Sequence, residues 1–327
     1  MVLGNKQLIK NNSLYNPLDG KYIFSASSGS TATGGFGRLS SNYGTTVSNI
    51  TPSLNYLDTD ISDTGEYGAI CLVRTSEPYN QYYRFYNYFA NSALITPSGG
   101  TGGTIERIAI SGNGQYWIQG AQDGLFLSSN YGAYSEKVTS FLPLDAIGGL
   151  AISYTGQYII ACSNYSTVIY SSSDFGVTWA VEHTHTIGTC DGVAMSGNGQ
   201  YRQILLRNIG SYYSHDYGAS YNASTGLSPY SDRFRVDMSI SGEFQLAVMG
   251  SKVYRSIDYG VSFSQITAMS TSYYAGVSVS GSGKIMTVCV YSASGKVYKS
   301  TDFGVTWSAI SAFVDSRYRV ATLNKLI

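Results

Sequence analysis

The sequence predicts an all-β protein that folds as a single seven-bladed β-propeller with four-stranded antiparallel blades. Three observations lead to this prediction. One short turn motif occurs seven times, at intervals of 42 to 45 residues. A second turn, centred on glycine, precedes each copy, and alternating apolar segments flank both turns. Four short strands in a period of this length are typical of a propeller blade.

The first motif reads Ser-x-Asp-Phe-Gly-Val-Thr-Trp in its two clearest copies, at residues 172–179 and 300–307. Asp and Asn can accept hydrogen bonds from backbone N–H groups of their own turn, and glycine adopts a positive φ without a Cβ penalty. Each copy is therefore expected to form a turn between two strands, in which the Asp or Asn is a structural residue. These seven positions are Asn42, Asn87, Asn130, Asp174, Asp216, Asp258 and Asp302.

The second motif is a glycine turn, which reads Ser-Gly-Asn-Gly-Gln-Tyr at residues 111–116 and 196–201. An Asn-Gly pair supplies the positive φ values that a tight hairpin needs. Apolar residues alternate before and after the turn, as at 107–110 and 157–161, which predicts a strand on either side. An aromatic residue stands four positions before the Asp or Asn in six of the seven copies, and we expect these aromatics in the core.

Together the two motifs resemble the Asp-box, or BNR, repeat family, whose Ser-x-Asp-x-Gly-x-x-Trp box lies between the third and fourth strands of a blade. The resemblance covers nearly the whole chain. The family includes sialidases, xyloglucanases, sortilin-type receptors and the seven-bladed photosystem II assembly factors. The residues of the box and of the glycine turn also resemble those in repeat proteins of large viruses and phages. In this family the box is structural, so the resemblance implies a fold and not a chemistry.

We expect residues 1–13 to form an N-terminal arm and residues 14–327 to form the propeller. Residues 317–323 resemble the first-strand segments at 232–236 and 106–109, although they follow the last box and its outgoing strand. They are therefore expected to be the inner strand of the first blade and to close the ring with chain from both termini. In the alternative, residues 14–16 form that strand and the C-terminus caps it.

The composition argues against several classes of partner. The 20 basic residues balance the 20 acidic residues, and 12% of the chain is charged, so no nucleic-acid partner is expected. No apolar run approaches the roughly 18 residues that span a bilayer, so no transmembrane segment is expected. The first residues lack the apolar block of a signal peptide, so we expect synthesis in the cytoplasm. The final location and the oligomeric state stay undetermined, and release by lysis or within a virus particle stays open.

The cysteines follow the repeat. Cys71, Cys162 and Cys289 each fall six residues after the glycine of their turn, where other blades mostly place small residues. A shared packing position predicts free, buried thiols rather than disulfides.

One segment contains metal-ligand residue types, namely Glu182, His183 and His185, followed by Cys190 and Asp191. Histidines two apart on an extended segment face the same side, and zinc accepts such donors. Since no other part of the sequence supplies a matching partner, ordinary loop histidines are expected. We predict no metal and no cofactor.

Candidate binding residues are expected on the face opposite the repeated turns, because loops of variable sequence on a rigid scaffold usually carry function. Tyrosines outside the repeat positions suit sugar stacking or a protein interface. Arginines at the start of the inner strands can attract a carboxylate or phosphate. The candidates are Tyr79, Tyr82, Tyr230, Tyr273, Tyr274, Arg107, Arg233, Arg235, Arg317 and Arg319. In the alternative, the tyrosines are surface residues with no binding role, and the arginines form ion pairs with Glu106, Asp232 and Asp315.

The function predicted from these observations is a non-enzymatic recognition or structural module, free or in a virion or other assembly, that binds glycan or protein through the variable-loop face. The alternative is a glycoside hydrolase of sialidase or xyloglucanase type. Hydrolysis of this kind needs two carboxylates about 5 to 10 Å apart. The acids available for it are Asp58, Asp60, Asp145, Asp191 and Asp232, and their spacing singles out no pair. The Pro-containing segment that sialidases carry near the N-terminus is absent, so we assign no catalytic residue.

Overall fold

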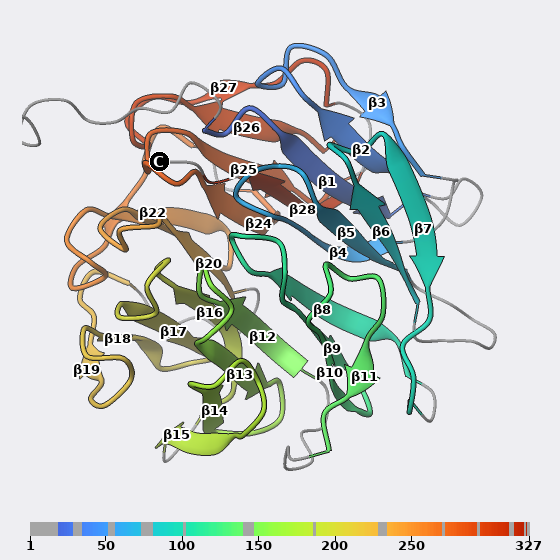
Figure 1. Cartoon of the computed structure of the whole chain (residues 1–327). Coiled ribbons are helices and arrows are strands. Elements are labelled where there is room, and N and C mark those ends of the chain that lie inside the picture. Colours follow the sequence, from blue (N-terminus) through green and yellow to red (C-terminus); the bar gives the residue numbers. More distant parts are fainter. Residues whose placement is uncertain are drawn as a thin grey trace, which may run out of the picture.

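The computed structural model describes residues 19–28, 35–51, 56–72, 81–100, 103–139, 147–185, 188–227, 234–269, 272–292, 295–313, 317–323 and 325. These residues form seven four-stranded antiparallel sheets and no helix, which confirms the predicted seven-bladed propeller (Figure 1). The inner strands of neighbouring blades contact one another in an unbroken cycle, so the ring is closed. In the described part of the chain, no helix is long and apolar enough to cross a membrane.

The blades are numbered along the chain, and their strands are given from the channel outwards. Blade one has β28 (Arg317–Leu323), β1 (Ile23–Ser28), β2 (Gly37–Ser40) and β3 (Ser48–Asn49). Blade two has β4 (Tyr56–Ile61), β5 (Gly68–Leu72), β6 (Tyr82–Tyr86) and β7 (Asn91–Ile95). Blade three has β8 (Ile105–Ile110), β9 (Trp117–Ala121), β10 (Gly124–Ser128) and β11 (Glu136–Lys137).

The remaining blades repeat this order. Blade four has β12 (Ile147–Ile152), β13 (Ile159–Ser163), β14 (Val168–Ser172) and β15 (Ala180–Thr184). Blade five has β16 (Cys190–Met195), β17 (Arg202–Leu206), β18 (Gly210–Ser214) and β19 (Asn222–Ala223). Blade six has β20 (Phe234–Met238), β21 (Gln245–Met249), β22 (Lys252–Ser256) and β23 (Ser264–Gln265). Blade seven has β24 (Tyr274–Val279), β25 (Met286–Val290), β26 (Val297–Ser300) and β27 (Ser308–Ala309).

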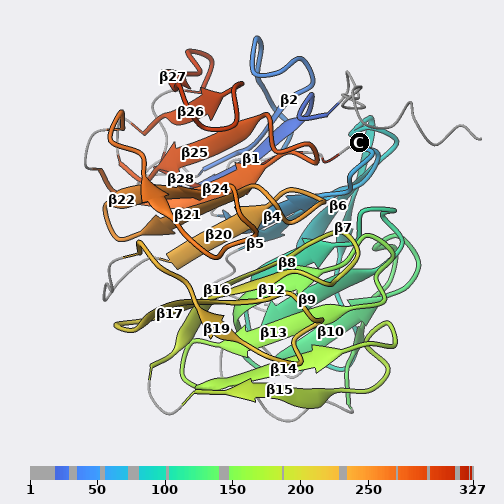
Figure 2. The same cartoon turned by 90° about the vertical axis from the view of Figure 1, so that its left-hand side faces the viewer.

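Blade one joins the two ends of the described chain. Its inner strand, β28, pairs antiparallel with β1, so that Ile23 lies opposite Leu323 and Phe24 opposite Thr322. Figures 1 and 2 both show the first strands, in blue, beside the last strands, in red. The proposed arm at 1–13 and the alternative inner strand at 14–16 lie outside the described residues.

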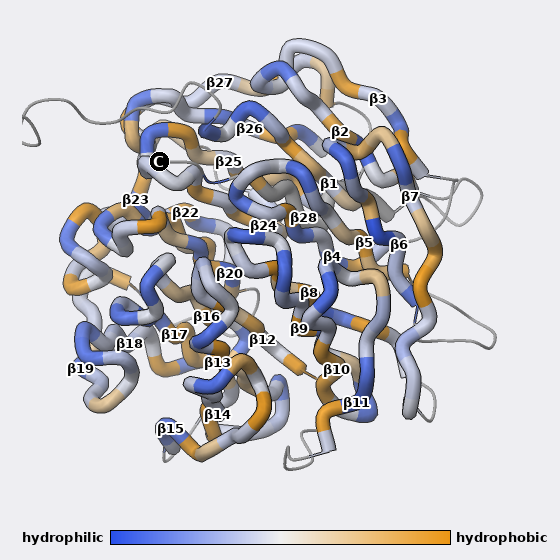
Figure 3. Tube along the Cα trace, viewed as in Figure 1, coloured by the Kyte–Doolittle hydropathy of each residue, from blue (hydrophilic) through white to orange (hydrophobic). Residues whose placement is uncertain are grey.

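The core lies between the faces of neighbouring sheets. Every residue of β5, β9, β13, β17, β21 and β25 is buried, because the second strand of a blade is covered on both faces. Three of the six predicted core aromatics, Phe126, Tyr170 and Tyr254, are buried in it. The other three are half-buried and pack against it, namely Tyr83, Tyr212 and Tyr298. Figure 3 shows the resulting pattern, with hydrophobic residues along much of β9, β10 and β12.

The box turn has the geometry that its residue types favour. The Oδ1 atom of Asp174 accepts hydrogen bonds from the Ser172 hydroxyl at 2.8 Å and from the backbone N–H of Thr178 at 2.9 Å. The Ser172 hydroxyl oxygen accepts the N–H of Gly176, whose φ is +82°. The same bonds recur at Asn42, Asn130, Asp216, Asp258 and Asp302. The decayed copy at Asn87 keeps positive φ values without the serine.

Aromatic pairs between neighbouring blades hold these turns. The residue after the box Asp or Asn is Tyr or Phe and has a φ of 54° to 63°, which is costly for a residue with a Cβ. Its ring packs on the aromatic of the glycine turn in the preceding blade, as Phe175 does on Tyr116 at 5.0 Å and Tyr259 on Tyr201 at 4.5 Å. At the junction of blades seven and one, Ile285 stands at the turn position and packs in the same cluster as Tyr43. Ring packing between blades therefore offsets the backbone strain.

Cys71, Cys162 and Cys289 are free and buried, as their repeat position predicts, and Cys190, which lies outside that position, is also free and buried. Burial raises the pKa of the Cys289 thiol to about 12.

Candidate functional site

A cavity of 190 Å³ lies along the propeller axis, between the inner strands of blades two to seven and the end of β28. Inner strands have a free backbone edge, which gives the cavity polar walls in addition to its side chains. The charged residues that line it are Asp58, Asp60, Asp63, Arg107, Asp191, Arg235, Asp237 and Lys325. The cavity is therefore a candidate binding site among the described residues.

Two arginines approach each other in this cavity. Arg107 donates from Nε to the carbonyl oxygen of Gly148 at 2.9 Å and from Nη1 to the carbonyl oxygen of Glu106 at 2.8 Å. Arg235 donates from Nη1 to the carbonyl oxygens of Phe234, at 2.7 Å, and Asp191, at 3.4 Å. Repulsion from Arg107, together with burial, lowers the pKa of Arg235 to about 10. The two guanidinium groups thus form a positively charged part of the cavity wall.

Asp191 lies beside the arginines and is only partly satisfied. Its Oδ2 atom accepts hydrogen bonds from Arg207, at 2.6 Å from Nη2 and 3.1 Å from Nε. Its Oδ1 atom is buried and has no hydrogen-bond partner among the residues that the structure describes. A buried carboxylate oxygen without a donor is costly, so this atom is suited to a donor from a ligand.

The other carboxylates of the channel connect neighbouring blades. Asp58 and Asp60 of blade two accept the backbone N–H groups of Ile108, at 3.1 Å, and Ile110, at 2.6 Å, in blade three. Asp237 of blade six does the same for Val279 of blade seven, at 2.8 Å. Each carboxylate supplies an acceptor to the free edge of the next inner strand, so these residues have a structural role.

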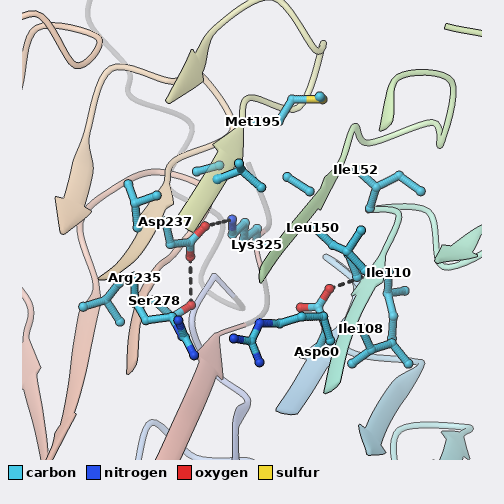
Figure 4. Close-up of a pocket in the computed structure, with 18 of the residues that line it drawn as sticks. Asp60, Ile108, Ile110, Leu150, Ile152, Met195, Arg235, Asp237, Ser278 and Lys325 are labelled. Atoms are coloured by element: carbon cyan, nitrogen blue, oxygen red, sulfur yellow. Dashed lines mark hydrogen bonds and ion pairs between the residues drawn. The ribbon is translucent and has the colours of Figure 1, made fainter. Parts of the chain in front are cut away.

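Lys325 brings the C-terminal segment into the channel. Its ammonium group donates to Oδ1 of Asp237 at 2.7 Å and to the carbonyl oxygen of Met238 at 3.0 Å (Figure 4). Burial raises the pKa of Asp60 to about 7 and that of Asp63 to about 8. Near neutral pH, both carboxyl groups are therefore partly protonated.

Apolar and charged side chains both line the cavity. Figure 4 shows the apolar residues Ile108, Ile110, Leu150, Ile152 and Met195 from blades three to five, with Asp60 beside Ile108 and Ile110 and with Asp237, Arg235 and Lys325 elsewhere around the space. Such a cavity suits a small ligand that carries both a charged group and an apolar group.

Of the five candidate arginines, the structure brings Arg107 and Arg235 together in the channel wall. Arg317 and Arg319 belong to β28, and their side chains lie outside the described ones. Arg233, Tyr79 and Tyr230 lie outside the described residues, as do Asp145, Asp232 and Asp315. Sequence analysis missed Asp63, Asp237 and Lys325, which reach the channel from distant segments.

Two of the candidate tyrosines are wrong as surface contacts. Tyr82 is 0% exposed. Its buried hydroxyl donates to the carbonyl oxygen of Gly132 at 3.0 Å and lies 2.9 Å from the hydroxyl of Ser135, both in the next blade. Tyr274 is 2% exposed and belongs to the core between blades six and seven. Both residues start a strand, and strand pairing turns their rings into the core.

Tyr273 lies at the surface, with 46% of its area exposed. Its ring is 6.0 Å from that of Tyr291, and its carbonyl oxygen accepts the Tyr291 N–H at 2.7 Å. Tyr291 follows β25, so the pair lies on the variable-loop face, opposite the repeated turns. The backbone bond holds the two residues side by side, so that their rings lie next to each other on this face.

The histidine segment forms a packing cluster. The rings of His183 and His185 lie 4.4 Å apart and pack on Tyr221, at 5.0 Å, and Tyr212, at 4.5 Å, of blade five. Glu182 pairs with Arg202. Burial, followed by repulsion from His183, lowers the pKa of His185 to about 4. Within the described ranges, no group of three or more His, Cys, Asp or Glu side chains is placed to hold a metal ion.

Comparisons with known proteins agree on the fold. No protein-family model and no curated protein matches the sequence. Among solved structures, an ancestral GH74 enzyme is similar over 68% of this chain and 33% of its own, with 15% identity and a TM-score of 0.54. The chain thus spans about a third of that enzyme's length.

Two other solved structures are similar over more of their own length. The first is U3-55K, with 10% identity, a TM-score of 0.61 and coverage of 79% of this chain and 81% of that one. The second is hydrazine synthase from Kuenenia stuttgartiensis, with 10% identity, a TM-score of 0.57 and coverage of 75% and 76%. At such low identities the similarities show the β-propeller fold alone.

Proposed function

We propose that this chain is a non-enzymatic recognition module that binds a glycan through its variable-loop face. The observation that carries the proposal is the pair of Tyr273 and Tyr291, in which an exposed ring lies beside a second ring. Tyrosine offers a large contact surface at a low cost in conformational entropy, and its flat face can stack on a sugar ring. Neither tyrosine occupies a position that the repeat requires.

The contacts of the channel acids support recognition over hydrolysis. Glycoside hydrolysis needs one carboxyl group as the acid and another as the base or nucleophile. Asp58, Asp60 and Asp237 each accept a backbone N–H of the neighbouring blade. Asp191 is paired with Arg207. Such engagement favours structural roles for Asp58, Asp60 and Asp237, and the likeness to an ancestral GH74 enzyme concerns the fold.

The proposal also assigns the seven repeats of this chain to the Asp-box type. The recurring bonds between the box Ser and Asp, and from the Asp to the turn backbone, support assignment of the boxes as Asp-box repeats. In this assignment the boxes and glycine turns build the scaffold and the other face carries recognition. Display of the module in a virion or another large assembly stays a prediction.

The experiment is a glycan array followed by solution affinities for the best glycan, with wild type and two tyrosine variants. Tyr273→Ala should weaken binding about tenfold or more, since an aromatic contact of this kind contributes about 1–2 kcal/mol. Tyr165→Ala is the matched control, because Tyr165 is 75% exposed in the turn between β13 and β14 on the same face. It should change affinity less than twofold. Absence of any bound glycan, or equal losses in the two variants, contradicts the proposal.

A further inference from the structure

We propose that the central channel is a binding site for a small aliphatic α-amino acid, held as a zwitterion by Arg107, Arg235 and Asp191. This site is distinct from the Tyr273 surface and does not depend on the proposed function. The inference comes from three features of the cavity: unused guanidinium donors, an acceptor without a donor among the described residues, and apolar lining residues.

The arginines provide the carboxylate site. Each guanidinium has five N–H donors, and the bonds of Arg107 and Arg235 go to backbone carbonyl oxygens. In the described part of the chain, no hydrogen bond engages Nη2 of either arginine. Two nearby guanidinium groups repel each other. The Asp58 carboxyl group already interacts with both, and a ligand carboxylate can reduce the repulsion further and accept paired N–H bonds from the unused nitrogens. The unused donors therefore select a planar anion.

Asp191 provides the ammonium site. Its Oδ2 atom is held by Arg207, while Oδ1 is buried without a donor in the described part of the chain. Arg235 donates to the backbone carbonyl oxygen of the same residue and interacts electrostatically with its carboxylate, so Asp191 borders the proposed carboxylate site. An α-amino acid carries its ammonium group on the atom next to the carboxylate carbon. One such head group can satisfy the arginines and Oδ1 of Asp191 together.

The remainder of the cavity suits an aliphatic side chain. A volume of 190 Å³ exceeds the roughly 30 Å³ that one water occupies and has room for a ligand of several heavy atoms. Its apolar lining residues include Ile108, Ile110, Leu150, Ile152 and Met195 (Figure 4). Transfer of an aliphatic side chain from water to contact with these residues is favourable.

Isothermal titration calorimetry at pH 6.5 tests the site with L-leucine and three analogues that each lack one group. Leucine should bind most tightly. Leucinamide, which lacks the carboxylate, 4-methylpentanoate, which lacks the amine, and glycine, which lacks the side chain, should each bind at least tenfold more weakly. Absence of leucine binding, or equal affinity for leucine and leucinamide, overturns the proposal.

Variants then assign the groups. Arg235→Lys keeps the charge but loses the planar fork, and should weaken leucine binding at least tenfold. Asp191→Asn should weaken leucine binding to a similar extent and leave the affinity for 4-methylpentanoate unchanged, a selective loss that misfolding does not produce. Arg255→Gln is the control, because Arg255 donates to the Phe303 carbonyl on the box face, and it should bind normally. Equal effects of Asp191→Asn on both ligands, or full affinity in Arg235→Lys, overturn the assignment. Tyr273→Ala should bind leucine normally, which separates this site from the proposed glycan surface.

Discussion

Removal of the Asp302 carboxylate should lower the free energy of unfolding by about 1–2 kcal/mol, as loss of a local side-chain-to-backbone cap does. Oδ1 accepts the backbone N–H groups of Val305, at 3.2 Å, and Thr306, at 2.9 Å, and the Ser300 hydroxyl at 2.7 Å. Oδ2 accepts the Thr306 hydroxyl at 2.5 Å. The turn is partly exposed, so water replaces some of these bonds in Asp302→Ala, and the loss stays well below their sum.

Asp302→Asn is the matched control, because blade one of the same chain has an Asn, Asn42, at the equivalent position. There Asn42 accepts the Thr46 N–H through Oδ1 at 2.9 Å and donates through Nδ2 to the Thr46 hydroxyl oxygen at 2.8 Å. An amide at residue 302 can make the equivalent bonds with Thr306. Asp302→Asn should therefore retain most of the stability that Asp302→Ala loses.

The assay is thermal and urea unfolding of the three proteins at pH 7 and at acid pH. Asp302→Ala should melt about 2–4 °C below wild type. Hydrogen bonds from Thr306 lower the pKa of Asp302 to about 2, below its ordinary value of 3.8. The folded state thus favours the ionised form, so the stabilisation is present above pH 4 and is lost as the pH falls through about 2. An Asp302→Ala protein as stable as wild type at pH 7 refutes the reasoning.

Three further predictions follow from burial. Tyr82→Ala and Tyr254→Ala should each destabilise the fold by about 3–5 kcal/mol in urea unfolding, because both delete a buried aromatic, whereas Tyr273→Ala should leave stability within about 0.5 kcal/mol; a neutral Tyr82→Ala contradicts the packing assignment. Asp63 has a pKa of about 8, so the folded state binds more protons than the unfolded state between about pH 4 and 8, and stability should fall over this range. Asp63→Asn should flatten that slope, and an unchanged slope excludes Asp63 as its cause. Mass spectrometry of the unreduced protein should find four free thiols, and an intramolecular disulfide at Cys71, Cys162 or Cys289 contradicts the assignment of that position to packing.

The repeats made the architecture predictable, because each box or glycine turn combines residues with strong local conformational preferences. Asp174 bonds to its own turn, and Gly176 adopts a positive φ, whatever the rest of the chain does. Seven such turns at even spacing determine the number of blades.

The channel was less predictable, because its groups meet only after the ring closes. Lys325 bonds to Asp237, which is 88 residues away, and no local pattern signals that contact. Tyr82 appeared to be outside the repeat, yet its hydroxyl finds partners about 50 residues further on, at Gly132 and Ser135. A tyrosine that ends in the core looks the same in sequence as one that ends at the surface. Arg107 and Arg235 were found because both stand at the start of an inner strand.

The measurement that tests recognition without catalysis most directly is an equilibrium binding experiment with product analysis on the same sample. The purified protein is incubated with the glycan that binds best on the array, and bound and free glycan are then separated and analysed by mass spectrometry. We predict saturable binding that Tyr273→Ala weakens about tenfold, with the glycan recovered intact after prolonged incubation. Shortened glycan products that wild type forms and that disappear in Asp58→Asn or Asp191→Asn would contradict the account and assign the channel to a glycoside hydrolase.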